Sequence, residues 1–227
     1  MCGRYSFALE DALILERFGL RVRTAIYKAR YNCAPAQNLA VISNEAPDTL
    51  NFFRWGLIPY WAKDPSIGSK LINARGETIH EKPSFKYAFR NRRCLIPATG
   101  FFEWKRSRTG GAKPASTPWH IGMKNGDAFC FAGLWDKWTA SDGECVHSFT
   151  IITTSPNSLM EQIHDRMPVI LRREDEQRWI AQPAGSSLSG LLKPFPAEMM
   201  DAWPVSNLVN SPKNDTPDVI TTILPGT

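Results

Sequence analysis

The stretch RCLIPATGFFEWK, residues 93–105, contains two short runs rich in apolar, aromatic and β-branched side chains. Runs of this length and composition, bounded by turn residues, are typical of β-strands. Similar runs recur on both sides of it: NLAVIS (38–43), TLNFFRW (49–55), PWHIGMK (118–124), DAFCFAGLW (127–135) and HSFTIITT (147–154). The sequence therefore predicts a β-rich centre.

The remaining pattern indicates turns and a few helices. KNGDA (124–128) is typical of a hairpin turn, and RSRTGGAKPAS (106–116) of a longer hairpin loop. Three helices are predicted. The one over 9–18 has apolar residues at helical spacing, the one over 155–164 begins with a capping-box pattern, and the one over 173–182 begins with acids that suit a first turn. With no repeat and no linker, we expect one α+β domain over 1–227. Its antiparallel sheets should be curved or barrel-like, with helices at the periphery.

Composition excludes several classes of protein. The five cysteines are odd in number and form no CxxC pair, so neither a disulfide framework nor a zinc site is indicated. Charged residues interrupt the N-terminal region, and the longest apolar stretch, 128–135, is too short to span a bilayer. The net charge of +5 is compatible with nucleic acid without being specific to it. We expect a protein of the cytoplasm that needs no metal and no cofactor.

The chain opens MCGRY, with a cysteine directly after the initiator methionine. If Met1 is removed, Cys2 carries a thiol and a free α-amine on one residue. Their ordinary pKa values, about 8.5 and about 7.7–8.0, leave both groups partly deprotonated near neutral pH. Taken alone, the position favours the simpler interpretation, an accident of the reading frame, so the rest of the chain must decide.

Four stretches are polar where a β-rich domain should be apolar. They are RYNCAPAQ (30–37), INARGET (72–78), GFFEWK (100–105) and IHDRMP (163–168). Each alone has an ordinary structural reading, such as a turn, a cap or a solvent-facing strand residue. Together they supply what an N-terminal cysteine needs to react with a carbonyl: an amide that holds the nucleophile and two groups that move protons. The candidates are Asn73, Glu103 and His164.

Glu103 has a particular environment in the sequence. It is flanked by Phe102 and Trp104 in an aromatic run. Loss of water around a carboxyl raises its pKa, and a raised pKa suits proton transfer near pH 7.

Seven motifs occur in this order along the chain: MCGRY, RYNCAPAQ, WGLIPYWAKD (55–64), LINARGETI (71–79), RRCLIPATGFFEWK (92–105), IHDRMPVIL (163–171) and VSNLVNSPKND (205–215). In this set and order the chain resembles the SOS-response-associated peptidase (SRAP) family of abasic-site-processing proteins. The resemblance runs from Cys2 to about Pro217. It implies a protein that binds single-stranded DNA containing abasic sites. The Cys2 amine would form a Schiff base with the opened sugar, and the thiol would close a thiazolidine ring. The stable crosslink would shield the lesion from strand cleavage.

The resemblance also implies roles for single residues. Asn73 would orient the nucleophile, Glu103 would handle protons at the amine and imine, and His164 would assist sugar ring opening and crosslink reversal. Arg4 and Arg75 would grip the phosphates that flank the lesion. The residues expected to line the strand are Asn32, Pro35, Thr153 and Arg166. Trp61 is a candidate stacking ring, although Ala62 follows it where some family members carry a second aromatic residue.

These implications define the expected partners and the alternatives. The partner is single-stranded DNA with abasic sites; no membrane and no metal are involved, and the chain is expected to be a monomer. It would associate with the bacterial nucleoid, or lie in the nucleus if the source is eukaryotic. One alternative is an N-terminal-nucleophile hydrolase resembling glutamine amidotransferases, which also begin MCG. Others are a peptidase confined to the Met1–Cys2 bond, and a non-covalent single-strand binder.

Overall fold

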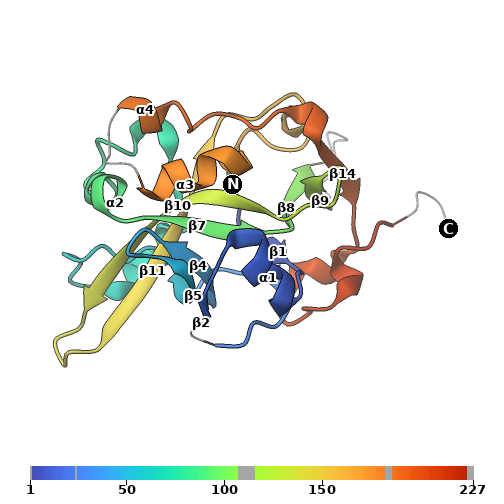
Figure 1. Cartoon of the computed structure of the whole chain (residues 1–227). Helices are drawn as coiled ribbons and strands as arrows, with labels where there is room; N and C mark the ends of the chain where they lie inside the picture. Colours follow the sequence, from blue (N-terminus) through green and yellow to red (C-terminus); the bar gives the residue numbers. More distant parts are fainter. Residues whose placement is uncertain (1, 24, 107–115, 182–185, 224–227) are drawn as a thin grey trace.

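The stretch 93–105 forms two strands, β7 (Arg93–Ala98) and β8 (Gly100–Arg106), and these belong to two different sheets. The computed structural model describes residues 2–23, 25–106, 116–181 and 186–223. The strands of the predicted β-rich centre are confirmed, and the helices lie outside them (Figure 1). The expected loop at 106–116 falls largely on residues 107–115, outside the described residues.

The larger sheet has nine strands and curls into a barrel. Its path runs β12-β11-β10-β7-β4-β5-β2, and β11 also pairs with β5, which closes a ring of five strands. Its members besides β7 are β2 (Val22–Arg23), β4 (Asn38–Ser43), β5 (Ala46–Trp55), β6 (Asn73–Arg75), β10 (Phe129–Thr139), β11 (Cys145–Thr154), β12 (Met167–Pro168) and β13 (Ile170–Leu171). Most pairings are antiparallel, as expected, but β11 pairs in parallel with β5 and with β6, and so does β2 with β5.

The smaller sheet has the order β14-β9-β8-β1-β3 and is antiparallel throughout. Its other members are β1 (Tyr5–Phe7), β3 (Arg30–Cys33), β9 (Ser116–Met123) and β14 (Met200–Pro204). KNGDA forms a turn, with Gly126 at a left-handed φ of 75° and its N–H donating to Met123 O. It links β9 to β10 in different sheets, so the expected hairpin at this point is wrong.

The helices match the sequence pattern only in part. Those predicted over 9–18 and 173–182 are confirmed as α1 (Asp11–Phe18) and α3 (Arg173–Ala181). Two short helices were not expected, α2 (Lys86–Asn91) and α4 (Ser186–Ser189). The short 3₁₀ helices are η1 (Pro65–Lys70), η2 (Gly76–Thr78), η3 (Met160–Gln162), η4 (Ala197–Met199), η5 (Asn207–Asn210) and η6 (Pro217–Val219). In the described part of the chain no helix is long and apolar enough to cross a membrane.

The helix predicted over 155–164 is wrong, since only η3 forms there. The side chain of Asn157 accepts a hydrogen bond from Met160 N at 2.9 Å and donates one to Phe195 O at 2.7 Å. An asparagine bonded to nearby backbone favours a turn over a continuing helix. The segment therefore stays irregular and carries His164 toward the strands.

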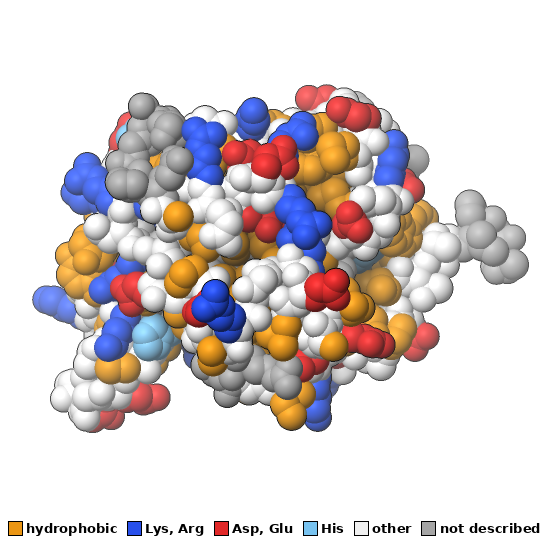
Figure 2. Space-filling view, viewed as in Figure 1, with side chains coloured by type: hydrophobic (Ala, Val, Ile, Leu, Met, Phe, Trp, Pro, Cys, Tyr) orange, Lys and Arg blue, Asp and Glu red, His pale blue; other side chains and the backbone are white. Residues whose placement is uncertain are grey.

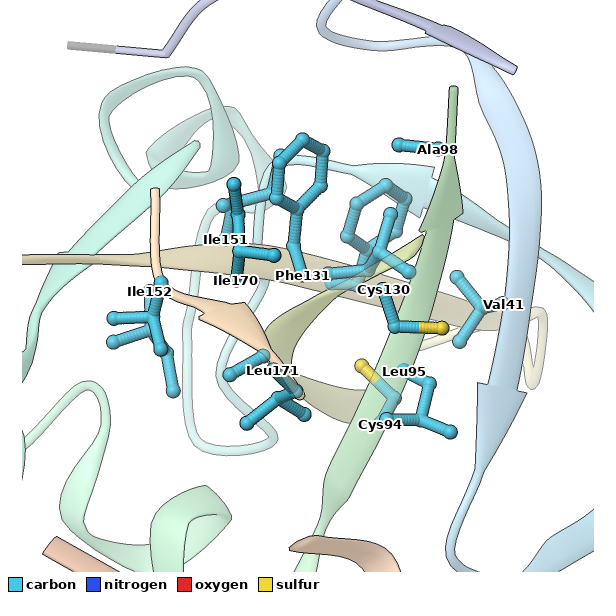
Figure 3. Packing of buried hydrophobic residues seen from close by; sticks show 14 of the residues in the cluster. Val41, Cys94, Leu95, Ala98, Cys130, Phe131, Ile151, Ile152, Ile170 and Leu171 are labelled. Carbon is cyan, nitrogen blue, oxygen red and sulfur yellow. The ribbon is translucent and has the colours of Figure 1, made fainter. Parts of the chain in front are cut away.

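The main hydrophobic core is one cluster that joins the barrel strands to β1, β8, α1 and α3. Figure 3 shows part of this cluster, with buried side chains of β4, β7, β10, β11 and β13 packed around the strands and Cys94 and Cys130 among them. Both cysteines are fully buried and free, and they pack as small core residues. The barrel provides a rigid support for the ends of β6, β11 and β12.

The turn at 34–37 contains a strained residue. Ala36 has a φ of 69°, and Gln37 N donates to Ala34 O at 3.4 Å across Pro35. This is a type II turn, which favours glycine at the position that Ala36 occupies. We expect Ala36→Gly to raise the free energy of unfolding by about 0.5–1 kcal/mol, because relief of strain exceeds the added flexibility of the unfolded chain. Thermal denaturation measures it, and Ala140→Gly, at an ordinary φ, should lower stability instead. Equal losses in both variants would contradict the strain.

Candidate active site

The N-terminal strand is placed on the strand that carries Glu103. β1 pairs with β8 through Tyr5↔Phe101 and Ser6↔Gly100, and Phe102 N donates to Arg4 O at 2.9 Å. Continued by two residues beyond Tyr5, this register sets Gly3 opposite Glu103. Cys2 therefore lies beside the carboxyl, close enough for Glu103 to affect the ionisation of its thiol.

Asn73 reaches the same point from the barrel. β6 lies in parallel beside β11, with Asn73 opposite Ile151. The Asn73 Nδ2 donates to the carbonyl of Cys2 at 2.8 Å. The Oδ1 of the same amide is buried and finds no hydrogen-bond partner among the residues that the structure describes. One end of the amide thus fixes the Cys2 backbone, and the other presents an acceptor next to it.

His164 completes the group from the irregular segment before β12. Its Nε2 lies 3.9 Å from Glu103 Oε2, and its Nδ1 accepts from Arg166 N at 3.0 Å. A ring that accepts at Nδ1 carries its proton on Nε2, which faces Glu103. Burial lowers the pKa of His164, so this neutral ring predominates at neutral pH. The Asp165 carboxylate also lies 2.9 Å from Nδ1, where it can accept from the other neutral form, with its proton on Nδ1, and from the protonated ring.

Burial sets the acid–base properties of the other two groups. Glu103 is 3% exposed, and loss of water raises its pKa to about 7, as its aromatic neighbours predict. Burial also raises the pKa of the Cys2 thiol, and the nearby Glu103 raises it further. The expectation that the thiol is partly ionised near neutral pH is therefore wrong for this environment. The thiol is held as S–H beside a carboxyl that gains or loses its proton near neutral pH.

The raised pKa of Glu103 predicts a pH-dependent stability. The folded state holds the proton more tightly than the unfolded state, so stability falls as pH rises from about 4.5 to about 7. Glu103→Gln lacks this loss. We expect the variant to gain up to about 3 kcal/mol relative to wild type between pH 4 and pH 8. Chemical denaturation at the two pH values measures it, and the exposed Glu161→Gln should follow wild type. A constant difference between wild type and Glu103→Gln would contradict the raised pKa.

Three of the residues expected to contact DNA are accessible. Arg75 ends β6 with an exposed side chain, Pro35 is half-buried at the type II turn, and Trp61 is 46% exposed. The backbone around Trp61 is fixed by the barrel: Asp136 accepts from Tyr60 N at 3.0 Å, and Trp138 donates to Ala62 O at 2.7 Å. The ring of Trp61 thus projects from a rigid loop.

Arg4 and Asn32 are joined to the segment 207–215, which we call the strap. Arg4 Nη1 donates to Asn32 Oδ1 at 2.7 Å and to Val209 O at 2.6 Å. The amide of Asn32 donates to three carbonyls of the strap, and Asp215 accepts from the backbone N–H groups of Tyr31 and Asn32. Asn32 is fully buried. We therefore place it in the support of Arg4 and the strap, rather than on a surface that a strand could touch.

Arg166 and Thr153 are bonded to each other in a similar way. Arg166 makes two parallel hydrogen bonds to Glu77, at 2.6 and 2.9 Å, and donates to Thr153 O at 2.8 Å. Thr153 is fully buried, so its side chain supports Arg166 and does not line an open strand site. The pair Arg166–Glu77 connects the His164 turn to η2, directly after Arg75.

A cavity of about 850 Å³ opens beside His164. Its walls include Trp104 and Trp119, the basic residues Lys105 and Arg106, and Asp165. The Lys105 ammonium lies 5.4 Å from the centre of the Trp119 ring. Sequence reasoning missed Trp119. The signal was the pairing of β8 with β9, which sets Trp119 opposite Glu103, but that register is not visible in one sequence.

The rest of the surface gives no simple charge pattern. On the face shown in Figure 2, basic and acidic side chains are interspersed, so the net charge of +5 is not gathered there into one basic patch. No cluster of three or more histidine, cysteine or acidic side chains suited to a metal ion occurs within residues 2–23, 25–106, 116–181 and 186–223. The groups that the described site brings together are the nucleophile of Cys2, the carboxyl of Glu103, the imidazole of His164 and the amide of Asn73.

Comparisons with known proteins give one consistent family. The family model described as SOS response associated peptidase (SRAP) matches residues 1–212. The abasic site processing protein YoqW of Bacillus subtilis is 46% identical over 226 residues, covering 97% of this chain and 99% of that protein. The abasic site processing protein HMCES of Xenopus tropicalis is 31% identical over 87% of this chain and 67% of its own length. A crystal structure of a protein from Bacteroides thetaiotaomicron matches 98% of this chain with a TM-score of 0.88 and 32% identity.

Proposed function

Because the chain belongs to the SOS response associated peptidase (SRAP) family, we propose that it processes abasic sites in single-stranded DNA by linking them covalently to Cys2. The names of its relatives support the substrate. One observation carries the chemistry: the residue after Met1 lies in a buried site with an amide, a carboxyl and an imidazole around it. We include in the proposal that this site removes its own Met1, for which the family's description as a peptidase is the support.

The covalent steps balance without a cofactor. Hydrolysis of the Met1–Cys2 bond frees the Cys2 amine. The amine attacks the aldehyde carbon of the opened sugar, and loss of one water gives an imine. The thiol then adds to the imine carbon, forming the C–S bond, and its proton ends on the nitrogen. The product is a five-membered thiazolidine that contains both Cys2 nucleophiles.

The surrounding residues fit these steps. Glu103, with a pKa of about 7, takes a proton from the amine and returns it to the departing water. Asn73 holds the Cys2 carbonyl and offers its buried Oδ1 to the amine. The neutral ring of His164, in the form with its proton on Nε2, lies beside Glu103 and can donate to the sugar oxygen during ring opening. Burial raises the pKa of the Cys2 thiol, and in the proposed sequence sulfur adds after the imine has formed.

The DNA strand would approach through the cavity beside His164. A site without a base leaves a gap, so the N-terminus enters without the full cost of unstacking a base. The rings of Trp104, Trp119 and Trp61 offer stacking surfaces that do not depend on base identity. Arginine contacts to phosphate supply affinity without sequence information.

The direct test uses a single-stranded oligonucleotide with one uracil. Treatment with a uracil glycosylase creates the abasic site, and the purified protein is added. We expect a band of reduced mobility that survives denaturing electrophoresis with the treated strand and is absent with the untreated strand. No such band with the treated strand would refute the proposal.

Arg75→Ala should weaken DNA binding without affecting ring closure. Its exposed side chain ends the strand that carries Asn73, so we assign it one phosphate contact. We expect Kd to rise by about 5- to 10-fold and the slope of log K against log salt to flatten by about 0.7. Fluorescence anisotropy over a salt series measures both. Lys124→Ala, in the turn between β9 and β10, should change neither. An unchanged slope in Arg75→Ala would show that Arg75 touches no phosphate.

A further inference from the structure

A buried histidine outside the group around Cys2 is bonded to the N-terminal strand. His120 lies on β9 and is 3% exposed, and its Nε2 is 3.0 Å from the hydroxyl of Ser6. Ser6 is the middle residue of β1 and is fully buried. The same hydroxyl lies 3.2 Å from Thr99 Oγ1, which accepts from Ala8 N at 3.0 Å. The ring of His120 is therefore linked to the middle of β1 through Ser6 and, through Thr99, to Ala8 just after the strand.

The surroundings of this ring are costly for a polar group. Its neighbours are the rings of Phe102 and Trp203, with centroids 4.8 Å away in each case. Burial lowers the pKa of His120 to about 3, so the ring is neutral at physiological pH. Its Nδ1 is buried and finds no partner in the described part of the chain. Packing alone would be served as well by phenylalanine, so the bond to Ser6 is the feature that needs a histidine.

The strand between them leaves room for this bond. The order is β9-β8-β1, so His120 must reach across β8 to meet Ser6. It does so at Gly100, which pairs with Ser6. A Cβ at Gly100 would stand 2.2 Å from the Cε1 of His120. Glycine, histidine and serine thus form a lock across three neighbouring strands.

The lock matters because β1 is short. It has three residues, and two pairs define its register on β8. A slip of one residue turns every side chain of a strand to the other face. We propose that His120 is a positioning residue, which acts through Ser6 to hold the register of β1 and so keeps Cys2 beside Glu103. This inference rests on the proposed function, since it assigns His120 to the Cys2 reaction.

The test separates the hydrogen bond from packing. His120→Phe keeps the ring and removes the bond. We expect the first-order rate of crosslinking at saturating DNA to fall by about 10- to 100-fold, because small displacements of a nucleophile have effects of this size. Kd for the abasic strand should stay unchanged. His120→Gln, whose amide nitrogen can reach Ser6, should recover most of the rate.

A second pair of variants shows whether the two residues act as one unit. Ser6→Ala should lose as much rate as His120→Phe, and the double variant should lose no more than either. Thr150→Val serves as the control, since it removes another buried hydroxyl without a described partner, on β11, and should react like wild type. Wild-type rates in both single variants, losses that multiply, or no recovery with glutamine would overturn the proposal. If His120→Phe fails to fold, Ser6→Ala still decides it.

Hydrogen exchange of a backbone amide measures how firmly β1 is held on β8, and it needs no DNA. The N–H of Phe102 donates to Arg4 O, directly beside Cys2. This amide should exchange faster in His120→Phe and in Ser6→Ala, but not in Thr150→Val. An unchanged exchange rate of this amide in both variants would contradict the claim that His120 and Ser6 hold the register of β1. A wild-type protein that forms no crosslink, with exchange altered as expected, would instead refute the proposed function and leave the lock in place.

Discussion

Cys2→Ala is expected to bind abasic single-stranded DNA with wild-type affinity and to form no complex that survives denaturation. Alanine keeps the α-amine but lacks the sulfur, so an imine can form and revert while no ring can close. The contacts assigned to phosphate, such as that of Arg75, are untouched. Anisotropy measures affinity, and denaturing electrophoresis measures the stable fraction. The expected effect on that fraction is complete loss.

Cys2→Ser provides the matched control for this result. It offers an amine and a hydroxyl, so borohydride should trap its imine while the untreated complex dissociates. A crosslink in Cys2→Ala as durable as in wild type would contradict the account, because the link would then form without sulfur.

Glu103→Gln is expected to slow crosslinking by about 10²- to 10⁴-fold, the usual contribution of a positioned proton carrier. In wild type the rate should rise as pH increases through about 7, because Glu103 then loses its proton and can accept one from the amine. Glutamine cannot do so, and the profile of the variant should lack this rise. Single-turnover rates between pH 5.5 and pH 8.5, measured at saturating DNA, give both quantities.

Two controls accompany that measurement. Glu161→Gln changes an exposed acid in η3, near His164 in sequence, and should keep the wild-type rate and profile. The intact mass of the Glu103→Gln preparation also reports on Met1. If Met1 is retained in this variant alone, its removal belongs to the same site. A Glu103→Gln protein with the wild-type pH profile would show that another group carries the proton.

The strands could be predicted because their composition is a local property. β7, β8 and β10 are apolar and aromatic over whole runs, and turn residues bound them. The closure of the barrel could not be predicted, since it depends on two parallel pairs between β5 and β11, about ninety residues apart. The helix expected at 155–164 failed for a similar reason. Asn157 bonds to Phe195 O, a contact that local spacing does not reveal.

The candidate site, too, could be predicted from the sequence only in part. The residue types that surround Cys2 could be found from chemistry and from ordered motifs, and the apolar neighbours of Glu103 predicted the direction of its pKa shift. What could not be seen is which polar residues are turned inward. Asn32 bonds to a strap some 180 residues away, and Thr153 faces Ala74 and Arg166 inside the barrel wall. Only tertiary contacts distinguish such supports from residues on an open surface.

Intact mass spectrometry of wild-type protein after reaction with an abasic oligonucleotide tests the central claim most directly. The account predicts a single adduct that needs no reductant, with the mass of the chain without Met1 plus that of the oligonucleotide, less one water. An adduct that still contains Met1, or one that appears only after borohydride treatment, would contradict it.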